Sequence, residues 1–184
     1  TIYYIMIEVY DNVLTKKQSD DLLSLCTNPY LAWYLFKEDI QYSKPYKQYS
    51  HYQMVHNLFN KMDSDQPLSI HYNFIYPLIQ TFITKFKLTG EIYRVKLNLL
   101  HNHYLSDTGT NPVHADHKEK HISLLYYIND SDGDTVFYKK YKEFHRVQPK
   151  KNRLVIAKGP IHHASNHPKN TENRFVLNTV LLTK

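Results

Sequence analysis

Three histidines and one arginine lie close together near the end of this 184-residue sequence. His162, His163 and His167 fall within the run KGPIHHASNHPKNTENRF, and Arg174 opens the apolar run that follows. Imidazoles bind metal ions, and a guanidinium holds a carboxylate through two parallel hydrogen bonds. Same-face neighbours on a strand recur every second residue, so all three histidines cannot ligate one ion from a single strand face. At most one or two of them therefore share an ion with a partner motif elsewhere.

The partner motif is VHADH, at residues 113–117. In an extended segment His114 and Asp116 lie on the same face, so an imidazole and a carboxylate can converge on one metal ion. Two histidines and one carboxylate leave open positions on an iron for a co-substrate and oxygen, as in non-haem Fe(II) oxygenases. By itself a His-x-Asp tripeptide is a weak indication among twelve histidines. The alternative is a turn in which Asp116 caps nearby backbone amides.

Composition limits the class of protein. A chain of 184 residues is long enough for one domain with a full core, and we expect a single domain over residues 1–184. The single cysteine excludes an internal disulfide and a cysteine-based zinc site. No apolar run is long enough for a membrane span, and the first residues do not resemble a signal peptide, so we expect a soluble, cytoplasmic protein without a membrane partner. The net charge of +6 favours acidic partners.

The apolar pattern predicts helices followed by strands. Thr15 and Gln18 form a capping-box pattern that begins a helix after an N-terminal strand, and apolar residues recur with helical spacing over residues 70–86, with Pro77 as a kink. Short alternating runs then recur, separated by turn residues. They are IYRVKLNLL, HISLLYYIN, DTVFY, RLVIA and RFVLNTVLL. This order predicts a mostly β fold with supporting N-terminal α-helices and a double-stranded β-helix, or jelly-roll, core.

We expect residues 1–90 to provide helical and loop support, and residues 91–184 to form the jelly-roll core with the active site. The segment AWYLFKEDIQYSKPYKQYSHYQ shows no clear period and is predicted to be an ordered loop. Its tyrosines and Trp33 could form a substrate-binding lid, or could simply pack over the sheet. Lys96 and Asn98 share one strand face and could line a pocket or a solvated sheet face.

These motifs, in this order, resemble the Fe(II)- and 2-oxoglutarate-dependent dioxygenases, in particular the prolyl 4-hydroxylase-like branch with its small microbial and phage members. The resemblance runs from about residue 92 to residue 182. It rests on HYLSDTGTNPVHAD, on SLLYYIN followed by DSDGDTVFY, on PKKNRLVIAKGPIHHAS, and on RFVL. The sequence departs from the family pattern at Asn152, where glycine is common, at Asp134, where glutamate is usual, and at Val176, where other branches carry serine.

The resemblance implies roles for particular residues. His114, Asp116 and one later histidine would bind Fe(II), with O2 and 2-oxoglutarate at the open positions. Family spacing to Arg174 favours His163, eleven residues before it, over His162 at twelve, while His167 at seven would be a loop residue. Arg174 would hold the distal carboxylate of 2-oxoglutarate, and the alternative is a surface ion pair. Further co-substrate contacts would come from Tyr104, Tyr127 and Asn178, although both tyrosines could equally be core residues.

The activity implied by the resemblance is hydroxylation of an unactivated C–H bond, with release of succinate and CO2, on a peptidyl or free amino-acid substrate. Oxidative demethylation of nucleic acid is an alternative, favoured by the basic runs KKYK and PKKNR. Against it, nucleic-acid demethylases carry a second arginine six residues after the first, and position 180 here is valine. The third hypothesis is a non-catalytic binding module that keeps the fold. The complete His, Asp, His and Arg set argues against it, because a binding module has no chemical need for all four residues.

The two adjacent histidines can be separated by mutation. We predict that His163→Ala abolishes iron binding, whereas His162→Ala and His167→Ala leave it nearly intact, because only His163 has the family spacing to Arg174. Metal content after anaerobic loading, measured for each purified variant, checks this. Loss of iron in His162→Ala with retention in His163→Ala would move the ligand by one residue.

Overall fold

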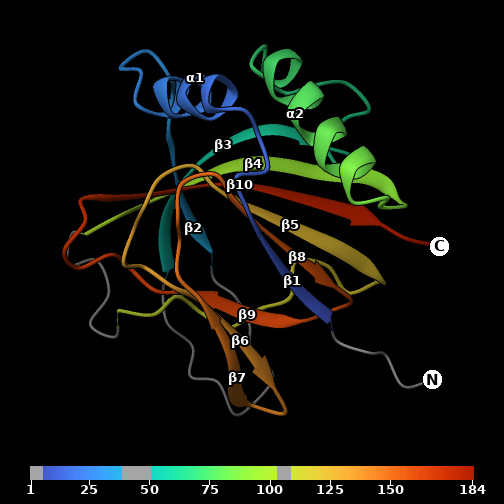
Figure 1. Cartoon of the computed structure of the whole chain (residues 1–184), viewed down its shortest axis with the longest axis vertical. Coiled ribbons are helices and arrows are strands. Elements are labelled where there is room, and N and C mark those ends of the chain that lie inside the picture. Colours follow the sequence, from blue (N-terminus) through green and yellow to red (C-terminus); the bar gives the residue numbers. More distant parts are fainter. Residues whose placement is uncertain (1–5, 39–50, 103–108) are drawn as a thin grey trace.

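The computed structural model describes residues 6–38, 51–102 and 109–184, and within them the chain forms two helices and ten strands (Figure 1). The helices are α1 (Lys16–Cys26) and α2 (Tyr72–Lys85). The strands are β1 (Met6–Asp11), β2 (Tyr34–Glu38), β3 (His51–Asn60), β4 (Glu91–His101), β5 (His121–Tyr127), β6 (Thr135–Lys139), β7 (Lys142–Val147), β8 (Arg153–Lys158), β9 (His162–Ser165) and β10 (Asn173–Leu182).

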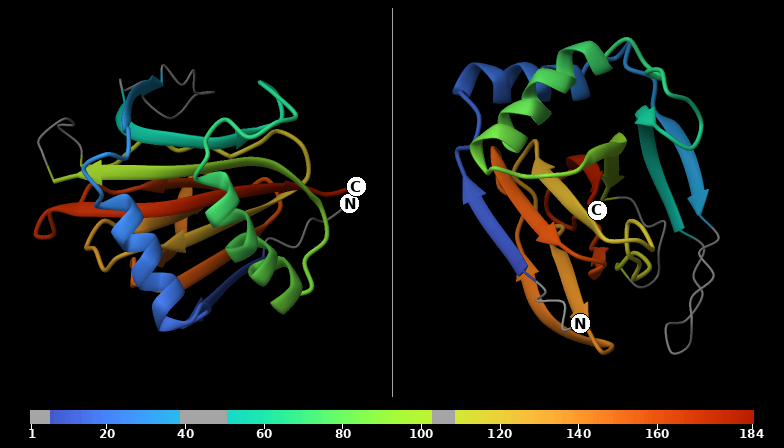
Figure 2. Two further views of the ribbon diagram at one scale, coloured as in Figure 1. Left: turned by 90° about the horizontal axis from the view of Figure 1, so that it is seen from above. Right: turned by 90° about the vertical axis from the view of Figure 1, so that its right-hand side faces the viewer.

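The strands form two antiparallel sheets. Seven strands make the large sheet, in the order β1-β8-β5-β10-β4-β3-β2, and three make the small sheet, in the order β7-β6-β9. Both helices lie over one face of the large sheet, and the small sheet lies on its other side (Figures 1 and 2). The chain therefore has three layers, in which the large sheet is covered on both faces.

The burial of β5 shows how this layering follows from the sequence. All seven residues of β5 are buried, which requires cover on both faces of the strand. Leu124 and Tyr126 point into the core beneath the helices, where Tyr126 stacks on Phe82 of α2 with ring centroids 5.4 Å apart. Leu125 and Tyr127 point into the second core, between the two sheets. Because side chains alternate along a strand, the same seven residues supply both cores.

Both predicted helices are confirmed. Thr15 caps α1, since its hydroxyl accepts a hydrogen bond from the Gln18 amide at 3.2 Å and the Gln18 side chain accepts one from the Thr15 amide at 3.0 Å. The buried face of α2 packs on the large sheet, and its members recur every three or four residues: Ile75, Leu78, Ile79 and Phe82. In the described part of the chain, neither helix has the length and apolar character needed to cross a membrane.

Asn152 explains one departure from the family pattern. It adopts a positive φ of 64°, a conformation that glycine and asparagine tolerate best. Its side-chain oxygen accepts a hydrogen bond from the Leu14 amide at 2.9 Å, and its side-chain nitrogen donates to the Leu14 carbonyl at 2.9 Å. Asparagine therefore meets the backbone requirement of the turn and also ties it to the N-terminal segment, which glycine could not do.

The prediction of a loop over the tyrosine-rich segment is wrong where the structure describes it. Residues 34–38 and 51–60 form β2 and β3, which pair with each other and extend the large sheet beyond β4. The edge strand β2 exposes three successive residues, Tyr34, Leu35 and Phe36, so it lacks the alternation that marks a half-buried strand. Trp33 packs against the core beneath the helices, with its ring 5.8 Å from that of Phe175. A lid formed by residues 39–50 falls outside the described residues.

Candidate metal centre

Three predicted ligands meet between the two sheets. The ligand atoms of His114, Asp116 and His163 all lie within 4.8 Å of one another. Backbone pairing brings the histidines together, because the His114 amide donates to the His163 carbonyl at 2.9 Å and the His163 amide donates back at 2.7 Å. Within the described ranges, no other group of three histidine, cysteine or carboxylate side chains is arranged to hold an ion.

Backbone carbonyls orient both imidazoles. The Nδ1 of His114 lies 3.0 Å from the Pro112 carbonyl, and the Nδ1 of His163 lies 3.1 Å from the Ile161 carbonyl. A ring nitrogen facing a carbonyl must carry the proton, which leaves Nε2 of each ring with a free lone pair for a metal. Burial, assisted by the nearby His163, lowers the pKa of His114 to about 4. The imidazole is therefore neutral near pH 7, as a metal ligand must be.

Asp116 is held by three donors from the large sheet. Its Oδ1 accepts from Arg94 Nη2 at 2.7 Å, its Oδ2 accepts from Ser123 Oγ at 2.6 Å, and Asn178 Nδ2 lies 3.3 and 3.4 Å from the two oxygens. Burial alone would raise the pKa of this carboxyl, but the nearby His163 and Arg94 outweigh it and hold the pKa below its ordinary range. Asp116 is therefore an ionised carboxylate in a fixed orientation.

Arg174 is a buried cation in the same cavity. Its side chain lines the cavity with the three ligands, and the residue is only 4% exposed. Nε donates to the Gly133 carbonyl at 2.6 Å and Nη2 donates to Thr135 Oγ1 at 2.8 Å, both of them neutral acceptors. Among the described residues no carboxylate lies within ion-pair distance of this guanidinium. Its location excludes the alternative of a surface ion pair and leaves an anion-binding group facing the cavity.

Two neighbouring loops fix the position of the Gly133 carbonyl, which accepts a hydrogen bond from Arg174. Asp132 accepts hydrogen bonds from the Lys169 and Asn170 amides at 3.1 and 2.8 Å, which joins the loop before β6 to the loop before β10. Between them the chain passes so close that a Cβ on Gly133 would lie 2.6 Å from the Asn166 carbonyl oxygen and 3.0 Å from the Arg174 Cδ. Only glycine fits there, so its carbonyl can reach the guanidinium.

Of the three further residues predicted to contact the co-substrate, the structure describes two, and only Asn178 of these lies in the cavity wall. Tyr127 is fully buried, its hydroxyl donates to Thr135 Oγ1 at 2.7 Å, and it is not among the side chains that line the cavity. Asn178 lines the cavity, with its amide nitrogen directed at Asp116. Tyr104 lies outside the described residues. Thr135 is the residue that sequence reasoning missed, although it lies in the run DSDGDTVFY that carries part of the resemblance, and its hydroxyl lies between Tyr127 and Arg174.

The three histidines of the segment at residues 162–167 lie in different environments. His163 is 6% exposed and faces the cavity, whereas its neighbour His162 is exposed, as alternation along β9 requires. His167 lies in the following loop as predicted, but it is buried, and its Nε2 lies 2.8 Å from Asn111 Oδ1. Since Asn111 lines the cavity, His167 supports the cavity wall, and it is not one of the three side chains grouped to hold an ion.

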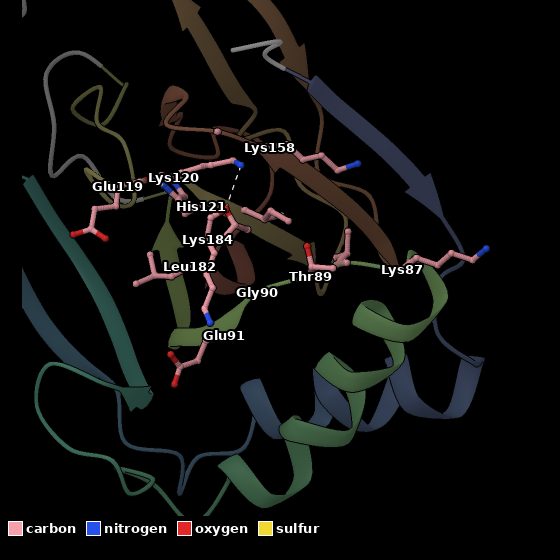
Figure 3. A pocket seen from close by; sticks show the side chains of 14 residues that line it. Lys87, Thr89, Gly90, Glu91, Glu119, Lys120, His121, Lys158, Leu182 and Lys184 are labelled. Atoms are coloured by element: carbon pink, nitrogen blue, oxygen red, sulfur yellow. Dashed lines mark hydrogen bonds between the residues drawn. The ribbon is translucent and has the colours of Figure 1, made fainter. Parts of the chain in front are cut away.

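A larger cavity, of about 1140 Å³, lies away from this centre (Figure 3). It is formed where the end of α2, the start of β4 and the end of β10 meet, and Lys120 Nζ donates to the Lys184 carbonyl across it at 3.4 Å. It contains none of the three metal ligands. Size alone therefore does not identify the site, whereas the smaller cavity holds the chemically distinctive groups.

Comparison with known proteins shows likeness in structure but not in sequence. No family model matches the sequence, and no curated protein matches it significantly. Among solved structures, a 2OG-Fe(II) oxygenase family oxidoreductase from Burkholderia pseudomallei superimposes with a TM-score of 0.68 at 12% identity, over 96% of this chain and 84% of that one. The prolyl hydroxylase of Trichoplax adhaerens, solved with a hypoxia inducible factor peptide, gives 0.66 at 12%, over 96% and 83%.

A third solved structure, the non-heme alpha ketoglutarate dependent epimerase SnoN of nogalamycin biosynthesis, gives a TM-score of 0.66 at 8% identity, over 96% of this chain and 78% of that one. The chain therefore has the fold of the 2OG-Fe(II) oxygenases, and the predicted jelly-roll core is confirmed. Because hydroxylases and an epimerase share this fold, likeness of fold does not determine the reaction.

The hydroxyl of Thr135 yields a prediction. Thr135→Val keeps the shape of the side chain but leaves the Tyr127 hydroxyl and Arg174 Nη2 without their acceptor in a buried site. We expect the free energy of unfolding to fall by about 1–3 kcal/mol, as measured by urea denaturation. Thr135→Ser keeps the hydroxyl and serves as the control. Equal stability of the valine and serine variants would show that the hydroxyl contributes nothing.

Proposed function

We propose that this protein is an Fe(II)- and 2-oxoglutarate-dependent dioxygenase that hydroxylates a C–H bond of a peptidyl or free amino-acid substrate, releasing succinate and CO2. The observation that carries the proposal is a buried guanidinium, Arg174, without a carboxylate partner among the described residues, in the cavity that also holds His114, Asp116 and His163. A metal site alone fits many proteins. A metal site beside a buried guanidinium can bind a dicarboxylate that chelates the metal at one end and pairs with the guanidinium at the other.

The donor set fits iron. His114, Asp116 and His163 supply two neutral imidazoles and one carboxylate from one side, which suits Fe(II) with open positions opposite. When bound, the iron and 2-oxoglutarate supply the oxidative decarboxylation and the activation of O2 that the protein's own side chains cannot perform. The solved SnoN complex with Fe3+ and alpha ketoglutarate shows that another protein of this fold holds both.

The chain's own contribution is to bind and orient. Arg174 would hold the distal carboxylate of the co-substrate, and its position is fixed beforehand by Gly133 and Thr135. Thr135 Oγ1 already accepts two hydrogen bonds, so its own proton is available to donate to the same carboxylate. Asn178 and Ser123 keep Asp116 turned toward the two histidines.

The cavity wall supports a polar substrate. Its other lining residues include amide and hydroxyl side chains, a lysine and three apolar residues: Gln53, Asn98, Asn111, Ser165, Lys96, Pro112, Leu125 and Val176. The side-chain oxygens of Asn98 and Asn178 are buried, and neither has a hydrogen-bond partner among the described residues. Such acceptors suit the N–H groups of a peptide or amino acid. The prolyl hydroxylase of Trichoplax adhaerens, whose structure contains a peptide, has the same fold.

Nucleic-acid demethylation is the second candidate. Position 180 carries valine where nucleic-acid demethylases carry a second arginine. This difference is a weak argument against demethylation, because Arg94 of β4 lies directly opposite Val180. A flipped base, however, is gripped by stacking on aromatic side chains. Apart from the two histidine ligands, no aromatic residue of the described chain lines this cavity. The described wall therefore favours an amino-acid or peptide substrate over a base.

Anaerobic titration with Fe(II) and 2-oxoglutarate, followed by exposure to O2, tests the function. We expect a weak visible charge-transfer band on mixing and slow succinate formation, which becomes faster with the correct member of a panel of peptides, amino acids and methylated oligonucleotides. Asp116→Ala is the control and should show neither signal. If the iron-loaded wild-type protein gives neither band nor succinate, the enzyme proposal fails and a binding module is favoured.

The role of Arg174 yields a separate prediction. Arg174→Ala should weaken 2-oxoglutarate binding a hundredfold or more, since loss of one partner of a buried charged pair costs about 3–5 kcal/mol. Arg174→Lys keeps the charge without the two-point geometry and should be milder. Iron affinity should stay unchanged in both, which isothermal titration can check. Unchanged 2-oxoglutarate affinity in Arg174→Ala would transfer the role to another cation, such as Lys96 in the same cavity.

A further inference from the structure

An arginine is bound to the carboxylate that completes the metal centre. Arg94 Nη2 lies 2.7 Å from Asp116 Oδ1, and the side chains of the two residues are 22% and 1% exposed. The other carboxylate oxygen, Oδ2, lies 3.7 Å from His163 Nε2. Oδ1 therefore faces the guanidinium, whereas Oδ2, which also accepts a hydrogen bond from Ser123 Oγ at 2.6 Å, faces His163.

The large sheet builds this arrangement as a row across three strands. On β10, Val180 pairs with Arg94 of β4 on one side and with Ser123 of β5 on the other. Directly opposite residues point to the same face of a sheet, so Arg94 and Ser123 lie on either side of Val180 and both contact Asp116. Two residues earlier on β10, Asn178 adds its amide on the same face.

A β-bulge lies directly beside Arg94 on β4. The pairing of β10 with β4 shifts between Val180 and Leu181, where Tyr93 is the extra residue on β4. A bulge interrupts the alternation of a strand and can redirect a side chain beside an active site. Immediately beyond the bulge, Arg94 faces the cavity side of the sheet with Lys96 and Asn98.

We propose that Arg94 is a positioning residue for the metal centre, which holds Asp116 Oδ1 so that Oδ2 is presented to the ion beside His114 and His163. The inference rests on the metal site in the proposed function. Arg94 does not line the cavity and so acts through Asp116. In its absence the carboxylate would keep only the neutral donors Ser123 and Asn178, of which Asn178 is distant at 3.3 Å or more.

Two opposite effects of Arg94 on metal affinity must be weighed. Its positive charge repels a divalent cation and draws electron density from the carboxylate, which weakens binding. Its hydrogen bond fixes the ligand and stabilises the buried carboxylate before the ion arrives, which strengthens binding. Loss of a partner that orients a metal ligand typically weakens affinity by about 10–100-fold. Orientation should therefore dominate, and removal of Arg94 should weaken binding.

Cobalt(II) titration of the full chain, followed by visible absorption, tests this role without any turnover. We expect Arg94→Gln to bind Co(II) about 10–100-fold more weakly than wild type and to change the ligand-field band. Arg94→Lys keeps the charge and can replace the single hydrogen bond that Arg94 Nη2 donates, so it should fall between the two with at most a several-fold loss. Arg153→Gln is the matched control, because the similarly exposed Arg153 pairs with Asp11 at 2.6 Å outside the cavity, and it should bind as wild type does.

The outcomes separate the possibilities. If Arg94→Gln unfolds more easily without metal but binds Co(II) with wild-type affinity and spectrum, Arg94 is a structural ion pair only and the inference fails. Tighter binding in Arg94→Gln would also overturn it, because repulsion would then outweigh orientation. Should the glutamine variant fail to fold, Arg94→Met takes its place, and wild-type Co(II) affinity and spectrum in that variant would refute the role. If the wild-type protein binds no Co(II), the metal centre itself fails, and with it the proposed function.

Discussion

The burial of unlike charges in one cavity is the constraint on which the site depends. Asp116 and Arg174 both lie between the two sheets, where an ion without partners is costly. Asp116 is stabilised by Arg94 and by neutral donors of the large sheet, whereas Arg174 meets only neutral acceptors among the described residues. The protein itself thus supplies a charged partner for Asp116, whereas Arg174 is positioned to bind an anion that enters the cavity. This asymmetry distinguishes a binding site from a structural ion pair.

The three layers make that burial feasible. The helices cover one face of the large sheet, which leaves the other face to carry the polar row on β4 and β10. The small sheet covers this row and contributes His163 from β9 and Thr135 from β6. Backbone pairing then fixes His114, on the segment between β4 and β5, beside His163 of β9.

The sequence patterns predicted both helices and six of the ten strands in the described residues, and missed β2, β3, β7 and β9. The five alternating runs after residue 90 became strands, and both helices formed where capping and spacing indicated. The exposed strands β2 and β7 escaped detection, because an edge strand stabilised by backbone pairing needs no apolar alternation. Asn152 shows the converse, since a departure from the family's glycine became understandable only once its positive φ and its bonds to Leu14 were visible.

The sequence by itself indicated the candidate ligands, because His114 and Asp116 lie two residues apart and Arg174 opens an apolar run. It also narrowed the later ligand to His163 or His162. Only the tertiary structure decided which residues support them: Arg94 and Ser123 reach Asp116 from positions 22 and 7 residues away, and Thr135 reaches Arg174 across 39. Strand register across the sheets brings these residues together. Register depends on the packing of the whole core, which no local pattern encodes.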